Sequence, residues 1–515
     1  MSYQFLGATP DYWCHVAPLV EANWTQEQIL SLAIPYRNAT REYDGCHMHD
    51  YNYTAAVELG YATSVSNVSA LGGGNGALVK CSSRTFNYTQ YTSTIVTEWD
   101  LVCERRVLYS TTQAVAHVGG LLGSLGFGYF IDRYGRRPVL LVCSMIKTAA
   151  SFMIPVSPTV EVYIILKGIL TCMASGQYLT LFVFAMETCA VKYRAAVGTL
   201  LVLPWALGYM LVPGIAYLVR QWKWLQFTYS IPGLSAIVYF WWFPESPRWL
   251  IVHGRNQEAL KVMTWSAKIN RNTLPPDHVL LASMKKMERQ GSLKKGEMAS
   301  SGGNNFLSLV FSKLKHIIIL CIIPQLRART LVSMFCWLSA GMVYYGVSLN
   351  ATNLSTDPYL YIFLGGLLEV PTYLLLWLAL MFIGRKKSLV ALYLVCGFFV
   401  ILVMALMLLY AADAEGVRVF LSLVGKVAVT AAYQVIWMYT AELYPTEYRS
   451  LAVGEGNSWS RMGSTFSSFI NDILGEHFIW APSALFGLMS LVSAALTLLL
   501  PETRHCEMPE SNDFI

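Results

Sequence analysis

The sequence predicts an all-α protein that crosses a membrane many times and is built from two similar helix bundles in tandem. Hydrophobic residues make up 55% of the 515 residues and charged residues only 13%, against roughly a quarter charged in a soluble domain. Apolar stretches of about 20 residues, each long enough to cross a hydrocarbon core of ~30 Å, recur along the chain. Three groups of charged residues at the ends of such stretches occur twice, which indicates duplicated bundles.

The three repeated groups share one register. Glu187 and Glu442 are each followed seven residues later by an arginine, Arg194 and Arg449. The matched pairs are Arg133 with Arg385 (offset 252), Glu187 with Glu442 (offset 255) and Glu245 with Glu502 (offset 257). Three independent matches at nearly equal offsets favour an internal duplication over coincidence.

Eleven apolar segments are predicted to span the membrane. They are expected to be helices, because lipid offers the backbone polar groups no other partner. The segments are 107–131, 138–156, 161–186, 195–218, 224–243, 328–349, 359–382, 388–411, 417–440, 450–472 and 480–500.

Basic loops determine the predicted orientation, because positively charged loops stay on the cytoplasmic side. Arginines and lysines follow the first, third and seventh segments and gather in the long loop before the sixth. The net charge of +6 is therefore explained by topology, and we do not interpret it as nucleic-acid binding. The predicted organisation is an extracellular loop 1–106, a bundle 107–243, a cytoplasmic loop 244–327, a bundle 328–500 and a cytoplasmic tail 501–515.

The first 106 residues are typical of an extracellular region. Five Asn-x-Ser/Thr glycosylation sites occur there, at Asn23, Asn38, Asn52, Asn67 and Asn87. Four cysteines are an even number in an oxidising compartment, so two disulfides are expected, and the sequence leaves their pairing open. These cysteines are Cys14, Cys46, Cys81 and Cys103.

Longer strings resemble a known family. Gly128-x-x-x-Asp-Arg-x-Gly-Arg-Arg137 resembles the signature loop of the major facilitator superfamily. Four further strings resemble solute carrier family 22, the organic ion transporters. These are Ser93-Thr-Ile-Val-Thr-Glu-Trp-Asp-Leu-Val-Cys103, Pro244-Glu-Ser-Pro-Arg-Trp-Leu250, Glu369-Val-Pro-Thr-Tyr373 and Tyr439-Thr-Ala-Glu-Leu-Tyr-Pro-Thr446. The strings at Glu369 and at Ser460-Arg-Met-Gly-Ser464 are most similar to the carnitine and zwitterion transporters of that family.

The resemblance implies a major facilitator fold with two pseudo-symmetric bundles. Members of the family have twelve spans, and the first precedes the glycosylated loop. Met1 begins almost inside that loop, and the stretch from Phe5 to Pro10 resembles the segment just after the first helix of family members. The prediction is therefore eleven spans, twelve minus the first, which puts transport competence in question.

The repeated charges form a hypothetical latch at the cytoplasmic ends of the bundles. Such charges can pair with the other bundle when the protein opens outward, and the pairs break when it opens inward. Exposed pairs contribute only ~0–1 kcal/mol each, so several must act together to bias the equilibrium. The alternative is that they only hold loops on the cytoplasmic side. The candidate gating residues are Asp132, Arg133, Arg136, Glu187, Arg194, Glu245, Arg248, Glu442 and Arg449.

Ionisable residues within the spans are candidates for a substrate site, because burying them in hydrocarbon is costly. The Arg461 guanidinium matches a carboxylate bidentately; the alternative is a permanent pair with Glu369, Glu455 or Asp472. Glu369, which precedes the helix-breaking Pro371, could face a quaternary ammonium. Lys426 and Glu455 lie nearer helix ends, and His117 is interpreted as a packing residue.

Aromatic rings would complete the ammonium site, because a cation over a ring gains ~0.5–2 kcal/mol. Trp337 and Tyr344 are seven residues apart, hence on one helical face, and Tyr373 lies four after Glu369. Tyr178, and with less weight Trp205 and Tyr209, are further candidates.

The predicted function is secondary transport of carnitine-like zwitterions across the plasma membrane by alternating access. Coupling to sodium or protons is left open, and no cofactor or metal is expected. Alternatives within the family are an organic anion or an organic cation transporter. A shortened membrane protein that does not transport but modulates a full-length relative is the alternative of another class. An enzyme is disfavoured, since the sequence contains no P-loop, Gly-x-Ser-x-Gly or metal-ligand cluster.

Overall fold

The computed structural model describes most of the chain. The described residues are 3–37, 42–72, 77–189, 197, 201, 203–299, 324–350, 357–409, 415–444, 449–475 and 478–503. The chain divides into two compact units, one of residues 2–109 with 218–225 and one of residues 110–217 with 226–515.

The first unit is a small α+β unit with three antiparallel strand pairs, β1 with β6, β2 with β3 and β4 with β5. Its core gathers buried apolar side chains such as Leu19, Leu32 and Ala56. Its elements are α1 (Tyr3–Leu6), β1 (Tyr12–Cys14), α2 (Ala17–Glu21), α3 (Gln26–Ala33), β2 (Tyr36–Arg37), β3 (Glu42–Tyr43), β4 (His47–His49), α4 (Tyr53–Leu59), α5 (Tyr61–Ser66), η1 (Val68–Leu71), β5 (Leu78–Lys80), β6 (Arg84–Phe86), α6 (Ile95–Trp99) and η2 (Cys103–Arg105).

Two disulfides hold this unit together. Cys14 is bonded to Cys81, with Cα atoms 5.4 Å apart, and Cys46 is bonded to Cys103, with Cα atoms 5.7 Å apart. The prediction of two disulfides among these four cysteines is confirmed, and the structure supplies the pairing that the sequence left open. Each bond closes a long loop, which restricts the unfolded chain.

The predicted glycosylation sites lie at the surface where the structure describes them. Asn23, Asn52 and Asn67 are exposed and Asn87 is half-buried, while Asn38 lies outside the described residues. The Asn52 Oδ1 caps α4 by accepting from the amide of Ala55, 3.2 Å away, which leaves its nitrogen for a glycan. Glycosylation and an extracellular location stay predictions.

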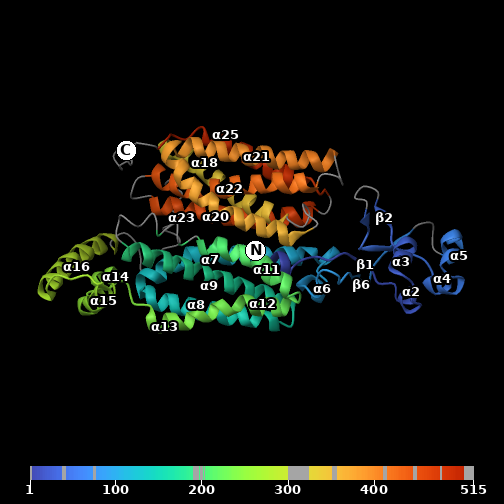
Figure 1. Ribbon diagram of the computed structural model, residues 1–515, viewed down its shortest axis with the longest axis horizontal. Coiled ribbons are helices and arrows are strands. Elements are labelled where there is room, and N and C mark those ends of the chain that lie inside the picture. The colour runs from blue at the N-terminus through green and yellow to red at the C-terminus, as the bar shows by residue number, and fades with distance from the viewer. Residues whose placement is uncertain are drawn as a thin grey trace. The chain divides into compact units, whose positions relative to one another are not determined.

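The second unit is a set of long apolar helices (Figure 1). We call α7 to α13 the N-bundle and α18 to α25 the C-bundle. The elements are α7 (Arg106–Tyr134), α8 (Arg136–Met153), η3 (Ile154–Val156), α9 (Val160–Thr188), α11 (Leu203–Leu218), α12 (Trp222–Ser230), η5 (Ile231–Ser235), α13 (Ala236–Trp242), α14 (Pro247–Val252), α15 (Asn256–Ile269), α16 (Asp277–Ala299), α18 (Pro324–Leu349), α20 (Pro358–Phe382), α21 (Arg385–Leu409), α22 (Glu415–Leu443), α23 (Arg449–Phe469), the π-helical η6 (Ile470–Leu474) and α25 (Ala481–Thr497).

Every predicted span contains a helix within its described residues. In the part of the chain that the structure describes, seven helical segments are long and apolar enough to cross a membrane, and they fall on α7, α8, α9, α18, α20, α21 and α22. The fourth and last predicted spans contain the shorter apolar helices α11 and α25, of 16 and 17 residues. In the fifth, Pro232 lies in the 3-10 turn η5 between α12 and α13. The count of eleven stays a prediction.

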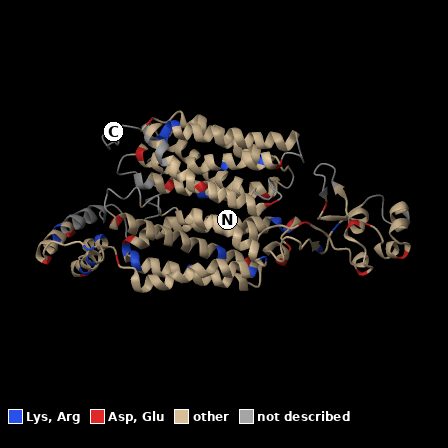
Figure 2. Cartoon of the chain, viewed as in Figure 1, with Lys and Arg blue, Asp and Glu red and all other residues tan. Residues whose placement is uncertain are grey.

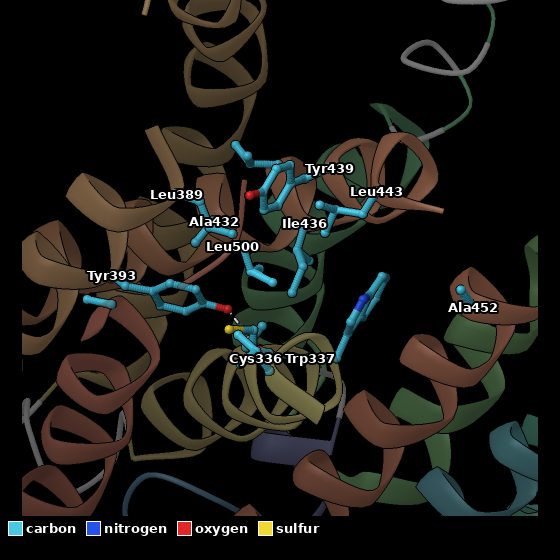
Figure 3. Packing of buried hydrophobic residues seen from close by; sticks show 14 of the residues in the cluster. Cys336, Trp337, Leu389, Tyr393, Ala432, Ile436, Tyr439, Leu443, Ala452 and Leu500 are labelled. Atoms are coloured by element: carbon cyan, nitrogen blue, oxygen red, sulfur yellow. Dashed lines mark hydrogen bonds between the residues drawn. The ribbon is translucent and has the colours of Figure 1, made fainter. Parts of the chain in front are cut away.

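The C-bundle is packed around large buried side chains (Figure 3). Trp337, Tyr393 and Tyr439 are at most 1% exposed, and they join α18, α21 and α22. The Tyr393 hydroxyl donates to the carbonyl of Cys336 at 2.8 Å. Because buried polar groups need hydrogen-bond partners, this bond allows the Tyr393 side chain to be buried in the core.

The helices α14, α15 and α16 follow the N-bundle and pack around Leu250, Ala259 and Met284. The Trp249 indole nitrogen donates to the carbonyl of Asp132 at 2.9 Å, which attaches α14 to the end of α7. Figure 2 shows that charged side chains are sparse along the middle of the bundle helices and frequent on α14 to α16 and near helix ends.

Candidate functional site

The end of the N-bundle carries a cluster of charges, which we call the N-cluster: Arg136, Glu187, Glu245 and Ser246. The Arg136 guanidinium donates to Glu187 at 2.6 Å and to Asp132 at 3.1 Å, and its side chain is only 7% exposed. The Ser246 hydroxyl donates to the other oxygen of Glu187 at 2.6 Å. Glu187 is therefore bound by Arg136 at the start of α8 and by Ser246 in the segment after α13.

Glu245 caps the N-terminus of α8. Its two carboxylate oxygens accept from the backbone amides of Arg136 at 2.8 Å and Arg137 at 3.1 Å. A carboxylate is favourable there because the first amides of a helix have no partner within the helix. The preceding Gly135 has φ +100°, and a Cβ on it would lie 2.4 Å from Glu245, so only glycine suits the turn.

The C-bundle repeats this arrangement in what we call the C-cluster: Arg385, Glu442, Glu502 and Thr503. The Arg385 guanidinium pairs with Glu442 at 3.1 Å, and the Thr503 hydroxyl donates to Glu442 at 2.6 Å. Glu502 accepts from the amide of Arg385 at 3.0 Å, so it caps α21 as Glu245 caps α8. Gly384 precedes Arg385 with φ +94°.

This geometry corrects the register of the first repeat. The structural counterpart of Arg385 is Arg136 and not Arg133, because both follow a glycine with positive φ and donate to the repeated glutamate. The Arg133 guanidinium instead binds the Tyr129 hydroxyl on its own helix. Arg248 is exposed on α14, whereas Arg194 and the side chain of Arg449 lie outside the described residues.

Both clusters close within their own bundle. Among the described residues, the ion pairs of the N-cluster and C-cluster join no residue of one bundle to a residue of the other. Among the latch residues that the structure describes, the predicted pairing between the bundles is therefore not formed in this conformation. Its formation in an outward-open conformation stays a prediction.

Glu369 is the centre of what we call the acid site, with Tyr344, Tyr373 and Lys426. Its side chain on α20 is buried, with 1% exposure. The hydroxyls of Tyr344 and Tyr373 donate to its two oxygens at 2.9 and 3.5 Å. The sequence therefore placed Tyr344 and Tyr373 correctly beside Glu369.

Lys426 is the residue that sequence analysis underrated. It is 1% exposed on α22 and interacts electrostatically with Glu369. Its ammonium donates to the hydroxyl of Tyr209 on α11 and lies 4.0 Å from the centre of that ring. A Cβ on Gly365 would lie 2.4 Å from this ammonium, so a glycine on α20 makes room for it. The one available signal was a lysine inside an apolar segment.

Arg461 lies apart from this acid in what we call the arginine site, with Tyr345, Tyr433 and Tyr178. Its guanidinium forms a hydrogen bond with Tyr345 and lies near the other two rings. The Tyr433 hydroxyl is 2.8 Å from that of Ser460. Within the described part of the chain no carboxylate lies within 4.0 Å of Arg461, and its Nε has no hydrogen-bond partner.

The three proposed permanent partners of Arg461 are occupied elsewhere or lie away from it. Glu369 binds two tyrosines, Asp472 accepts from Ser110 at 2.8 Å, and Glu455 interacts with Trp459. The alternative of a fixed ion pair therefore finds no support in the described residues.

The remaining aromatic candidates have different surroundings. Trp337 has no exposed surface, and its nitrogen donates to Thr440 at 3.0 Å, so it belongs to the packing between α18 and α22. This position departs from the predicted one beside the ammonium, because the indole turns into the C-bundle. Tyr178, in contrast, is 53% exposed on α9.

Several contacts join the two bundles near these sites. The Trp205 nitrogen donates to the Tyr344 hydroxyl at 3.3 Å, and the rings of Tyr217 and Tyr359 are 5.8 Å apart. Tyr217 and Tyr359 lie at helix ends that the sequence predicts to be extracellular, and so do Ser110 and Asp472, which are joined by a hydrogen bond.

The comparisons with known proteins agree with this architecture. A family model described as Sugar (and other) transporter matches residues 68–512. The xylose transporter XylE from E. coli, in an inward open conformation, superposes with a TM-score of 0.60 at 16% identity, covering 80% of this chain and 90% of that one. A peptide transporter, POT, superposes with a TM-score of 0.52 at 13% identity over 76% and 85% of the chains. The chain therefore has the major facilitator fold and is a multi-pass membrane transporter, as predicted.

The relatives define the family more narrowly. An organic cation transporter protein of Drosophila melanogaster is 30% identical over 98% of this chain and 87% of its own length. The human organic cation/carnitine transporter 2 is 33% identical over 83% of this chain and 72% of its own length. Human solute carrier family 22 member 2 is 28% identical over 98% and 87%. The chain belongs to solute carrier family 22, and the prediction that it is not an enzyme is confirmed with it.

Proposed function

We propose that the protein moves carnitine-like zwitterions across the plasma membrane by alternating access. The observation that carries the proposal is the contrast between two charges in the C-bundle. The Glu369 carboxylate accepts hydrogen bonds from two tyrosine hydroxyls and interacts electrostatically with Lys426, whereas Arg461 interacts with tyrosines and with no carboxylate among the described residues. A guanidinium without a counter-ion is costly in a membrane protein, so a substrate carboxylate is its natural partner.

The aromatic rings of the arginine site would hold the ammonium end. Tyr345, Tyr433 and Tyr178 surround Arg461, and a cation over a tyrosine ring gains about 0.5–2 kcal/mol. Glu369 orients Tyr344 and Tyr373 through their hydroxyls, and its carboxylate would attract the ammonium end. A zwitterion thus meets a positive end and an aromatic, negatively polarised end.

The distribution of contacts supports alternating access. Contacts between the bundles occur at the predicted extracellular ends and near the acid site, for example between Ser110 and Asp472. The N-cluster and C-cluster, at the opposite ends, pair only within their own bundles among the described residues. This is the arrangement expected of an inward-facing state, in which the latch is broken.

An organic anion is the second candidate substrate. The observation that favours it is the buried Lys426, a second positive charge within the C-bundle in addition to Arg461. An anion with an apolar ring could place its carboxylate at Arg461 and its ring among the tyrosines. Neither candidate identifies a coupling ion, and sodium or protons remain alternatives.

The test is uptake of labelled L-carnitine in cells, normalised to surface-biotinylated protein, for the wild type and Arg461→Leu. We expect uptake to fall at least tenfold, because a hydrogen bond to a charged group contributes about 1.5–3 kcal/mol. Arg255→Leu is the matched control, because Arg255 pairs with Glu258 on exposed α15. Carnitine uptake that survives Arg461→Leu would contradict the proposal. Surface delivery without uptake of any organic ion would favour a modulator that does not transport.

A further inference from the structure

A histidine of the N-bundle lies beside the arginine site. His117 is on α7 and only 9% exposed. Its ring lies 4.7 Å from that of Tyr345 on α18, at an interplanar angle of 74°. Tyr345 is the residue that forms a hydrogen bond with Arg461. The histidine therefore meets the C-bundle beside Arg461, which has no carboxylate within 4.0 Å among the described residues.

The backbone of α7 brings Arg461 close to the same helical turn. A methyl group placed on Gly120 would lie 3.8 Å from the guanidinium carbon of Arg461. Gly120 is three residues after His117, so both project from one face of α7. The guanidinium of Arg461 therefore lies in van der Waals range of this face of α7.

The ring nitrogens of His117 have no hydrogen-bond partner among the residues that the structure describes, although the side chain is more than nine-tenths buried. Buried polar groups are normally paired. The ring of Tyr345 packs against this ring, and the positive charge of Arg461 acts on it electrostatically. An anion bound between the two residues would accept a hydrogen bond from the His117 imidazole and would pair with the Arg461 guanidinium.

We propose that His117 is a second binding residue for the substrate carboxylate, so that one carboxylate bridges Arg461 of the C-bundle and His117 of the N-bundle. This inference rests on the proposed function and adds a residue of the opposite bundle to it. The neutral imidazole donates one N–H to a carboxylate oxygen while the guanidinium binds the other. Substrates with a carboxylate then connect the two bundles directly, and cations without one do not.

The experiment separates the N–H from the ring. His117→Phe keeps an aromatic ring against Tyr345 but removes the donor, whereas His117→Gln removes the ring and keeps a donor. Purified wild type, both variants and Arg461→Leu are titrated with L-carnitine, phenylacetate and choline, with Kd obtained from ligand-induced thermal stabilisation. The melting temperature without ligand reports on structural damage.

We expect His117→Phe to raise the Kd of both carboxylates roughly tenfold, the effect of one hydrogen bond to a charged group, with choline unchanged. His117→Gln should stay closer to the wild type. In the Arg461→Leu background, His117→Phe should have a smaller further effect, because the two residues share one ligand. Should His117→Phe not fold, His117→Leu replaces it.

Wild-type carboxylate affinity in His117→Phe would overturn the inference, and so would an equal loss of choline affinity. Binding of phenylacetate but not of carnitine, with the same dependence on His117, would keep the inference and remove the zwitterion from the proposed function. If the wild type bound neither carnitine nor phenylacetate, both the inference about His117 and the proposed function would be wrong.

Discussion

The ends of the two bundles are alike, whereas their centres are not. Each end pairs an arginine with a glutamate, receives a hydroxyl from a serine or threonine, and caps a helix with a second glutamate. In the centre, the C-bundle buries Glu369 and Lys426 and carries the half-buried Arg461, and the N-bundle contributes tyrosines, Trp205 and His117 to the contacts around them. Duplication has preserved the ends, and the centre has diverged.

This difference suggests a division of labour. Two similar clusters at equivalent ends suit a movement in which two rigid bundles rock against each other. In such a movement the contacts of the N-cluster and of the C-cluster with the opposite bundle break in the same step. An asymmetric centre suits recognition, because a zwitterion has two different ends and needs two different partners. Substitutions in the clusters should then change transport rate, and substitutions in the centre should change substrate preference or stability.

The largest effect is expected at the acid site. Lys426→Met leaves the buried Glu369 carboxylate without the positive charge that it interacts with electrostatically, and an uncompensated buried charge is strongly destabilising. We expect a much lower melting temperature in detergent and a lower surface level. The double variant Lys426→Met with Glu369→Gln should recover most of the stability, since no unpaired charge remains. A double variant that is no more stable than the single one would show that Lys426 acts through Tyr209 instead.

An intermediate effect is expected at the clusters. Arg136→Gln and Arg385→Gln each remove the guanidinium from a repeated glutamate, and a charged hydrogen bond contributes about 1.5–3 kcal/mol. We expect both to lower the maximal rate of carnitine uptake by a similar factor with little change in KM. Surface-normalised uptake curves measure both quantities. A change confined to one variant, or a change in KM alone, would show that the two ends are not functionally equivalent.

The sequence predicted much of this comparison but not all of it. The apolar segments, the duplicated glutamates and the position of Tyr373 beside Glu369 follow from spacing, because 3.6-residue periodicity places residues four apart on one helical face. The bond of Tyr344 with Glu369 depends instead on how α18 and α20 pack. The correspondence of Arg136 with Arg385 could not be predicted from spacing, because it depends on the positive φ of Gly135 and Gly384.

The partners of Lys426 and the surroundings of His117 could not be predicted, for a different reason. Both depend on which helices of the two bundles meet, and a single helix's sequence carries no record of its neighbours. Trp337 shares a helical face with Tyr344 by spacing, yet its indole is held in the core by Thr440. The disulfide pairing likewise depends on how β1 and β5 approach in space.

The smallest effect tests the equivalence of the ends most directly. Ser246→Ala and Thr503→Ala each remove one hydroxyl that donates to a repeated glutamate at 2.6 Å. Each glutamate keeps its arginine, so we expect a loss of about 1 kcal/mol in the free energy of unfolding. The two hydroxyls share no partner, and the double variant should therefore lose the sum of the two single losses. Melting temperatures of the three purified variants measure this, with Ser283→Ala on exposed α16 as the control. A combined loss larger than the sum would mean that the two clusters are energetically coupled. The predicted latch requires such coupling in the conformation in which the two clusters meet.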